Sequence, residues 1–338
     1  MDVRNVDPLT HGLLGVAVAV AVAPKEHRRA AAVVGFLAGE FPDLDVLLRS
    51  KDDPLFGLAM HRHFTHSLLM VPVIGMTMAW LVARVHRWRG GDSSVKALAG
   101  AGMLAAFSHA FCDVWTSYGT RWFWPFSDQR VSWDWISVID PLFTLPLLPL
   151  VVIGVMRRSR VWMFRAMIWA VFYLSLCVVQ KHRVMDAARA VAAERGDAHE
   201  RLTVKPSFGN IVVWRALYEV EGRAEVMSFR AGKEVILLGQ SRASLVRLAD
   251  LPQINGDSVL GRDIRRFAHF SDDWLAWHPQ HPGVLGDLRY ALRPDVVSPL
   301  WGIKVDPRVP DRHVAFLSFR STRDEGWEEL WAMIVKED

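Results

Sequence analysis

The chain has 338 residues, of which 51% are hydrophobic, and its formal net charge is +4. This composition is apolar for a soluble protein and polar for a pure transporter, so it indicates a membrane part joined to a water-soluble part. The small charge excess, without a Lys/Arg-rich tract, argues against nucleic-acid binding. Two well-separated cysteines, Cys112 and Cys177, argue against a disulfide framework and a cysteine-based metal site.

Six apolar segments in the first half of the chain predict membrane helices, because crossing about 30 Å of hydrocarbon takes about 20 residues. Three are strongly apolar and lie at residues 68–85, 141–156 and 161–180. The others are shorter or carry ionisable residues, and they lie at residues 12–23, 30–41 and 95–114. We therefore expect an α-helical integral membrane domain of about six membrane helices, the first two short, kinked or re-entrant.

Basic residues in the loops predict the orientation of these helices. The loops after the first, third and fifth segments are rich in Lys and Arg, which places them in the cytoplasm under the positive-inside rule. In a multi-pass protein, the loops 41–67 and 115–138 would then face outward, and the N-terminus and the C-terminal domain would share that side. Lys181, His182 and Arg183 after the sixth segment favour the opposite side.

The character of the chain changes after the last apolar segment. Residues 184–200 are typical of a helical connector, and from residue 201 strand-like runs such as AEVMSFRA and KEVILLGQ alternate with Gly and charged residues. We therefore expect three parts: a membrane domain at 1–183, the connector at 184–200, and a soluble, strand-rich α+β domain at 201–338.

Ionisable residues gather at one predicted membrane face, where they are costly and indicate a functional site. His109 and Asp113 are four residues apart and share a helix face. Imidazole and carboxylate groups are ligands for Zn²⁺, and carboxylates also suit Mn²⁺ and Mg²⁺. The set at this face comprises His11, Asp43, Asp45, His61, His63, His66, His109, Asp113 and Asp140.

Simpler roles compete with metal binding for several of these residues. Asp43 could end a helix or cap the next one, and Thr65 and Ser67 are placed to cap the third segment. His63 could point away from its neighbours, since only some of residues 61, 63 and 66 can share one face. Convergence of the whole set at one face nevertheless favours a divalent metal site of one or two ions, with zinc preferred over Mn or Mg.

Five short motifs in order carry a resemblance to a known family. They are DPLTHG, FPDLD, HRHFTHS, SHAFCDVWTSYG and IDPLF, over residues 7 to 145. Together they resemble the family of bacterial inner-membrane, membrane-bound metal-dependent hydrolases typified by YdjM. The pattern is also similar to that of zinc-dependent phospholipases C, by analogy. The chain departs from the family at His63, where a small residue is expected. The resemblance implies these site residues: His11, Asp43, Asp45, His61, His66, His109 and Asp113.

The sequence thus predicts a hydrolase acting at the membrane–water interface on a phosphoester of a lipid or other amphiphile. Asp45 would be a ligand or the base that deprotonates water, with His66 beside it in the reacting centre. Arg62 would either neutralise a phosphate or form a surface ion pair. Trp115, Trp122 and Trp124 would anchor in the interface. The alternatives are a metal-ion or proton transport protein without hydrolytic activity, and a membrane protein whose fold a metal stabilises.

Overall fold

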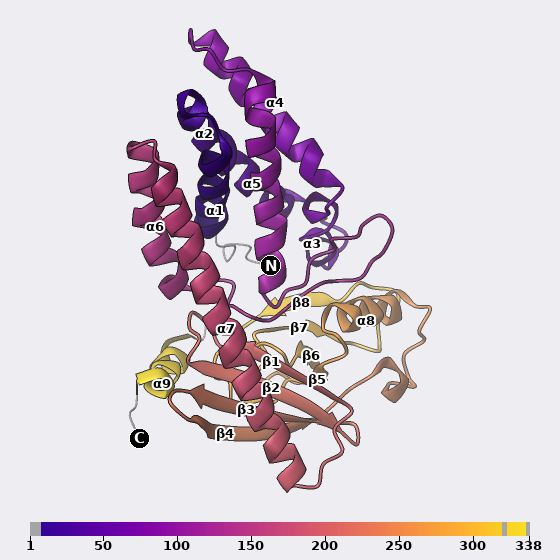
Figure 1. Ribbon diagram of the computed structural model, residues 1–338. Helices are drawn as coiled ribbons and strands as arrows, with labels where there is room; N and C mark the ends of the chain where they lie inside the picture. The colour runs from indigo at the N-terminus through magenta and orange to yellow at the C-terminus, as the bar shows by residue number, and fades with distance from the viewer. Residues whose placement is uncertain (1–7, 320–322, 336–338) are drawn as a thin grey trace. The chain divides into compact units, whose positions relative to one another are not determined.

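The computed structural model describes residues 8–319 and 323–335. Asp7, the first residue of the DPLTHG motif, lies outside them. The described residues fall into two compact units. One, here called the membrane unit, contains residues 8–48 and 60–177, and the other, the C-terminal unit, contains residues 49–59 and the described residues from Val178 onward. The first is helical and the second is built mainly from two β-sheets (Figure 1).

Each of the six predicted apolar segments forms a helix. Two helices are long and apolar enough to cross a membrane, and a third span results if the bent pair of residues 56–66 and 70–88, with 75° between its halves, counts as one. The structure therefore has a helical N-terminal region with two candidate spans, or up to three, and six membrane helices stay a prediction. The helices are α1 (Pro8–Val22), α2 (Arg28–Glu40), α3 (Phe56–Met60), α4 (Met70–Trp88), α5 (Val95–Trp115), α6 (Pro141–Met156) and α7 (Arg160–Glu194), with 3-10 turns η1 (Lys25–His27), η2 (Phe41–Leu47) and η3 (Phe64–His66).

Small residues let the helices of the membrane unit approach closely. Helices α1, α2, α4 and α5 share a core of mostly Ala, Val and Ile side chains. The backbones of α1 and α2 meet at Gly15 and Gly35, where a Cβ on Gly35 would lie 2.5 Å from the Gly15 carbonyl oxygen. Such contacts between small residues are typical of membrane helices, which gain little from hydrophobic association in lipid.

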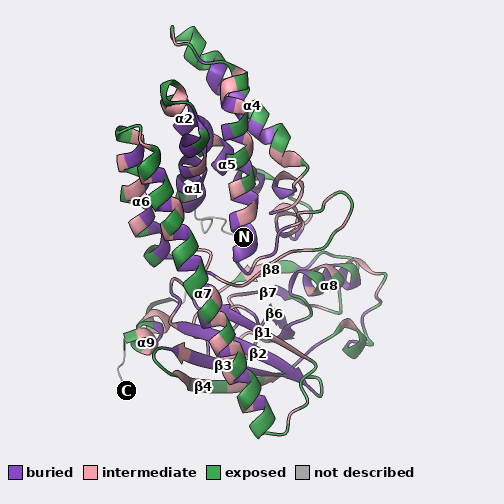
Figure 2. Ribbon diagram, in the orientation of Figure 1, coloured by how far each residue is buried: buried purple, intermediate pink, exposed green. Residues whose placement is uncertain are grey.

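The outward surface of the membrane unit is apolar. Figure 2 shows exposed residues along the outer faces of α4, α6 and α7, and these include Trp80, Ile168 and Val171, with exposed fractions of 54%, 67% and 66%. A continuous apolar surface of this kind is unfavourable in water and suits a lipid environment. The outer surface and the spans therefore agree on a membrane location.

Two antiparallel four-stranded sheets form most of the C-terminal unit, so the prediction of a β-rich domain is confirmed. Both sheets keep sequence order, β1-β2-β3-β4 and β5-β6-β7-β8. A shared apolar cluster that includes Leu217, Val226, Trp274 and Leu288 joins them. The strands are β1 (Arg201–Pro206), β2 (Val213–Val220), β3 (Arg223–Ala231), β4 (Val235–Ser244), β5 (Leu275–Trp277), β6 (Val284–Asp287), β7 (Trp301–Lys304) and β8 (Ala315–Ser318), accompanied by η4 (Leu248–Asp250), α8 (Val259–Phe270) and α9 (Arg323–Val335).

An early segment of the chain is part of the C-terminal unit. Within Arg49–Ala59, Leu55 is fully buried and the Asp53 carboxylate accepts two hydrogen bonds from Arg266 of α8, at 2.8 and 3.1 Å. Arg266 also pairs with Asp263 at 3.1 Å, and Asp263 in turn contacts His313 Nδ1 at 2.8 Å. This closed network of ion pairs holds the segment against α8.

We expect Gly35→Ala to lower the melting temperature of the detergent-purified protein, because the new methyl group would collide with the α1 backbone. Overpacking of this kind costs about 1–3 kcal/mol. Gly100→Ala is the matched control, since a Cβ at Gly100 of α5 meets nothing within 4 Å. Equal melting temperatures for the two variants would contradict close packing of α1 against α2.

Candidate metal centre

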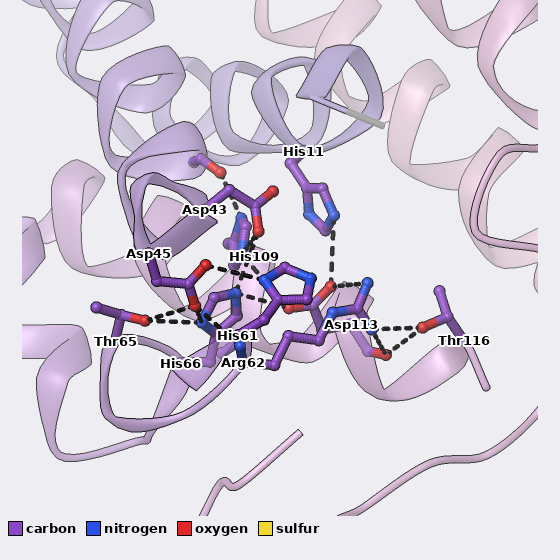
Figure 3. Close-up of polar contacts among 12 residues, drawn as sticks. His11, Asp43, Asp45, His61, Arg62, Thr65, His66, His109, Asp113 and Thr116 are labelled. Atoms are coloured by element: carbon purple, nitrogen blue, oxygen red, sulfur yellow. Dashed lines mark hydrogen bonds and ion pairs between the residues drawn. The ribbon is translucent and has the colours of Figure 1, made fainter. Parts of the chain in front are cut away.

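Four buried side chains meet in the membrane unit from three separate elements. They are Asp43 of η2, His66 of η3, and His109 and Asp113 of α5 (Figure 3). One potential ligand atom of each lies within 4.8 Å of the others. The HxxxD spacing on α5 turns both of its side chains to the same face, as expected. Two imidazoles and two carboxylates form a donor set that suits a divalent transition metal.

The tautomer of His109 is fixed by the backbone of α2. Its Nδ1 lies 2.5 Å from the Gly39 carbonyl oxygen. Because a carbonyl oxygen only accepts, Nδ1 carries the proton and Nε2 keeps its lone pair. That Nε2 is buried without a hydrogen-bond partner and lies 3.4 Å from Asp113 Oδ2. A backbone carbonyl that holds the far nitrogen of a histidine is a recurrent device for orienting metal ligands.

His66 is oriented in a similar way. Its Nδ1 lies 2.9 Å from the Thr65 hydroxyl, which itself donates to Asp45 at 3.2 Å. Since the hydroxyl proton is used on Asp45, the hydroxyl oxygen accepts from His66 Nδ1. The opposite nitrogen, Nε2, faces the cluster at 3.1 Å from Asp113 and 3.3 Å from Asp43. Both imidazoles therefore present Nε2 to the same small volume.

The two carboxylates of the cluster have oxygen atoms without hydrogen bonds. Asp43 Oδ2 and both oxygens of Asp113 are buried and lack hydrogen-bond partners. Buried carboxylate oxygens normally find donors. Oxygens without hydrogen bonds, beside two aligned Nε2 atoms, fit a cation.

His11 of α1 lies at the edge of the cluster. Its Nε2 is 3.5 Å from Asp113 Oδ1, and its ring centroid is 4.1 Å from that of His109. Its Nδ1 is buried without a hydrogen-bond partner. The structure thus brings His11 next to the four central residues, where it is available as a further ligand.

Asp45 and His61 lie together one step away from the central four. Asp45 Oδ1 is 2.9 Å from His61 Nδ1, and Asp45 Oδ2 accepts the Arg62 backbone N–H at 2.8 Å and the Thr65 hydroxyl. Three hydrogen-bonding partners make Asp45 suited to orienting the histidines around it. Asp43, Asp45 and His61 also form a group with ligand atoms within 4.8 Å of one another, which could hold a metal ion.

Arg62 is a buried ion-pair partner, so the surface ion pair considered from the sequence is wrong. Its side chain is 2% exposed, and its guanidinium lies 3.0 Å from Asp113 Oδ1. It also donates to the Thr116 hydroxyl at 2.6 Å and to the Asp113 carbonyl at 3.2 Å. Arg62 adopts a left-handed backbone conformation with φ 57°, and its guanidinium points into the site.

Other candidate residues lie elsewhere. The His63 ring contacts Phe64 and Trp124 at centroid distances of 6.2 and 5.7 Å, away from the cluster. Asp140 caps α6, where it accepts from the backbone N–H groups of Leu142 and Phe143, and it also accepts from the Tyr173 hydroxyl at 2.9 Å.

The capping roles predicted for Thr65 and Ser67 are wrong. Helix α4 has Leu69 at its N-cap and no side-chain cap. The Ser67 hydroxyl donates to the Phe64 carbonyl, and the Thr65 hydroxyl donates to Asp45. Sequence reasoning also missed the carbonyl of Gly39, because a backbone partner leaves no signal in residue type.

These features define a class: a helical membrane protein with a buried Asp/His cluster that could hold a metal ion. A family model described as YdjM inner membrane protein matches residues 6–184, more than half of the chain. The chain belongs to this family, as its motifs indicated.

One curated relative adds little on function. The "Uncharacterized protein YfhP" of Bacillus subtilis (strain 168) is 29% identical over 119 residues, which cover 33% of each chain. The chain thus matches about a third of that relative's length. No solved structure gives a significant match.

We expect His66→Ala and Asp113→Ala to abolish metal binding, because each removes an atom from the four-residue group. About one to two ions of Zn or Mn per chain should be present in the wild type and absent from both variants, by elemental analysis of the purified protein. The control is His63→Ala, which changes a neighbouring imidazole outside the cluster and should keep the metal. Metal loss from all three variants would point to unfolding and not to ligation.

Asp45→Asn separates an orienting role from ligation. If Asp45 only orients the ligands, the Asn substitution should weaken metal affinity by roughly 10–100-fold. Competition with a chelator measures this affinity. Loss of one ion from a protein that binds two would instead identify Asp45 as a ligand of the second ion.

Proposed function

We propose that this protein is a membrane-bound metal-dependent hydrolase that acts on a phosphoester of a lipid or other amphiphile. The observation that carries the proposal is the pair of oriented imidazoles, whose Nε2 atoms face the buried carboxylates of Asp43 and Asp113, each with oxygen that no hydrogen bond satisfies. Pre-orientation of this kind is what a hydrolytic metal centre requires.

Asp43, His66, His109 and Asp113 would hold the first ion, with His11 beside them. A divalent metal bound there supplies Lewis-acid activation of water and of a phosphoryl oxygen. Asp43, Asp45 and His61 would hold a second ion if one is present. Zinc fits two imidazoles and two carboxylates well, and Mn²⁺ or Mg²⁺ would draw more on the carboxylates.

Arg62 gives the site a fixed positive charge. Its guanidinium holds Asp113 in place, while its Nε is buried without a hydrogen-bond partner. A planar guanidinium suits the oxygens of a phosphate group. The chain therefore offers one group that both positions a ligand and can bind the anionic part of a substrate.

Asp45 is the candidate for proton transfer if only one ion binds. Its carboxylate connects His61 and His66, two imidazoles that can pass a proton on. In the arrangement with two ions, the same carboxylate would be a ligand. The Asp45→Asn variant decides between these roles.

The chain belongs to an inner-membrane family. We propose that it is multi-pass and that the site lies on the periplasmic side, because the loop charges favour that orientation. The substrate would then be a lipid whose headgroup lies at the level of the site. A protease added to intact right-side-out spheroplasts should remove a C-terminal tag, and a protected tag would overturn this orientation.

The hydrolase proposal predicts metal-dependent cleavage of phospholipid in mixed micelles. Wild-type protein reloaded with Zn or Mn should release the phosphorylated headgroup from phosphatidylethanolamine or phosphatidylglycerol, measured by ³¹P NMR. Chelation and Asp113→Asn should each reduce release to the protein-free background, because both remove the ion. His63→Ala is the control that should retain activity.

Failure has a defined meaning in this experiment. Protein that binds metal and leaves both lipids and a water-soluble phosphodiester intact would contradict the phosphoesterase proposal. If the ligand variants then unfold, a metal-stabilised fold would account for the cluster. If they stay folded, an ion pathway would account for it.

A further inference from the structure

The loop between α5 and α6 carries aromatic side chains that point out of the membrane unit. Within residues 121–126, RWFWPF, the side chain of Phe126 is 86% exposed and that of Phe123 is 45% exposed. Exposed phenylalanines are unfavourable in water. We propose that this segment, here called the aromatic tip, inserts into the boundary between lipid headgroups and acyl chains and sets the depth of the metal centre.

The aromatic tip is fixed to the turns that carry the site. The Arg121 N–H donates to the Arg62 carbonyl at 3.2 Å, and the Leu68 N–H donates to the Trp122 carbonyl at 3.0 Å. The indole of Trp122 donates to the Ala110 carbonyl of α5 at 2.8 Å. These bonds attach the tip on both sides of His66, so the position of the tip determines that of the ligand.

The tip continues the lipid-facing surface of a membrane span. Leu104 and Phe107 of α5 are 42% and 40% exposed, and the rings of Phe107 and Phe111 stack at 5.7 Å. Phe111 in turn stacks on Trp122 at 6.1 Å. Because α5 is a candidate span, this apolar path runs from the hydrocarbon region to the tip without a polar break. Lipid is therefore the occupant that this surface fits.

Further exposed apolar side chains occur next to the site residues. Leu44, between Asp43 and Asp45, is 53% exposed, and Leu69, three residues after His66, is 51% exposed. Aliphatic side chains that project beside buried ligands indicate that the site borders on lipid. Beyond the tip the surface changes, since Asp128 and Gln129 are exposed.

Of the three tryptophans predicted to anchor in the interface, Trp115 is 5% exposed, so its predicted role is wrong. Trp122 and Trp124 are half-buried, and their interfacial roles stay predictions. Trp122 donates to the Ala110 carbonyl, and Trp124 packs against His63 and Phe64. These contacts support the loop, and the exposed phenylalanines supply the surface that we propose meets lipid.

The inference is tested by the depth of a nitroxide attached at Phe126→Cys, in protein reconstituted into phosphatidylethanolamine–phosphatidylglycerol vesicles. The matched control is Asp128→Cys, two residues away with a side chain that is 76% exposed. The native cysteines Cys112 and Cys177 are buried, and wild-type protein carried through labelling reports any reaction of theirs. Both substituted side chains are exposed, so the fold should tolerate the changes.

A label at 126 should lie about 5–10 Å below the headgroup level, with high oxygen access and low access to a nickel chelate. The label at 128 should show the reverse. High nickel access at 126 would overturn the proposal in favour of an aqueous loop. Low access to both reagents would overturn it in favour of a protein-covered surface, such as a contact with a second copy.

The depth measurement does not depend on hydrolysis, because the inference concerns the surface and not the reaction. Metal content of the same labelled samples is measured separately. A label deep in the membrane on protein without metal would support the membrane contact and contradict the hydrolase proposal. A shallow label on protein with bound metal would contradict the membrane contact and leave the hydrolase proposal intact.

Discussion

Burial of several carboxylates in one place is the constraint on which the membrane unit depends. Asp43, Asp45 and Asp113 are at most 8% exposed, and the buried guanidinium of Arg62 pairs with Asp113. Taking charges out of water costs several kcal/mol per ion unless they are paired. Metal ligation requires neutral imidazoles, and the three carboxylates with Arg62 would then leave two formal negative charges, which one divalent cation would balance. The charge count is therefore consistent with the ligand that the donor atoms favour.

Close helix packing supplies the geometry that this charge balance needs. Gly15 and Gly35 let α1 and α2 approach to backbone contact, and the end of α2 brings the Gly39 carbonyl to His109. A wider separation would remove both the tautomer control on His109 and the contact of His11 with Asp113. Glycines, which have no side-chain functional group, thus determine which nitrogen of His109 is available to a metal ion.

The sequence predicted the parts of the fold that repeat regularly. Apolar segments marked six of the seven helices α1 to α7, all except the short α3, and the i, i+4 spacing of His109 and Asp113 identified two members of the cluster. Asp43 and His66 were also correctly predicted to lie beside these two residues, because all four lie at or next to the ends of apolar segments. Strands β3 and β4 were visible as strand-like runs between Gly and charged residues.

Contacts that depend on tertiary structure were beyond the reach of residue patterns. Nothing in the sequence says that Asp45 accepts three hydrogen bonds or that Asp140 is turned towards Tyr173. Strands β5 and β7 are only three and four residues long, too short for a period to be read. Trp and Phe in one aromatic run could not be divided into supporting and exposed residues until their neighbours were known.

The segment Arg49–Ala59 has a consequence for how the chain can be divided. The chain leaves the membrane unit after Leu48, contributes Asp53 and Leu55 to the C-terminal unit, and returns at Met60. A domain joined at one point can be removed by a single truncation. Here a truncation after α7 would strip Asp53 of its partner Arg266 and leave a piece of the C-terminal unit behind.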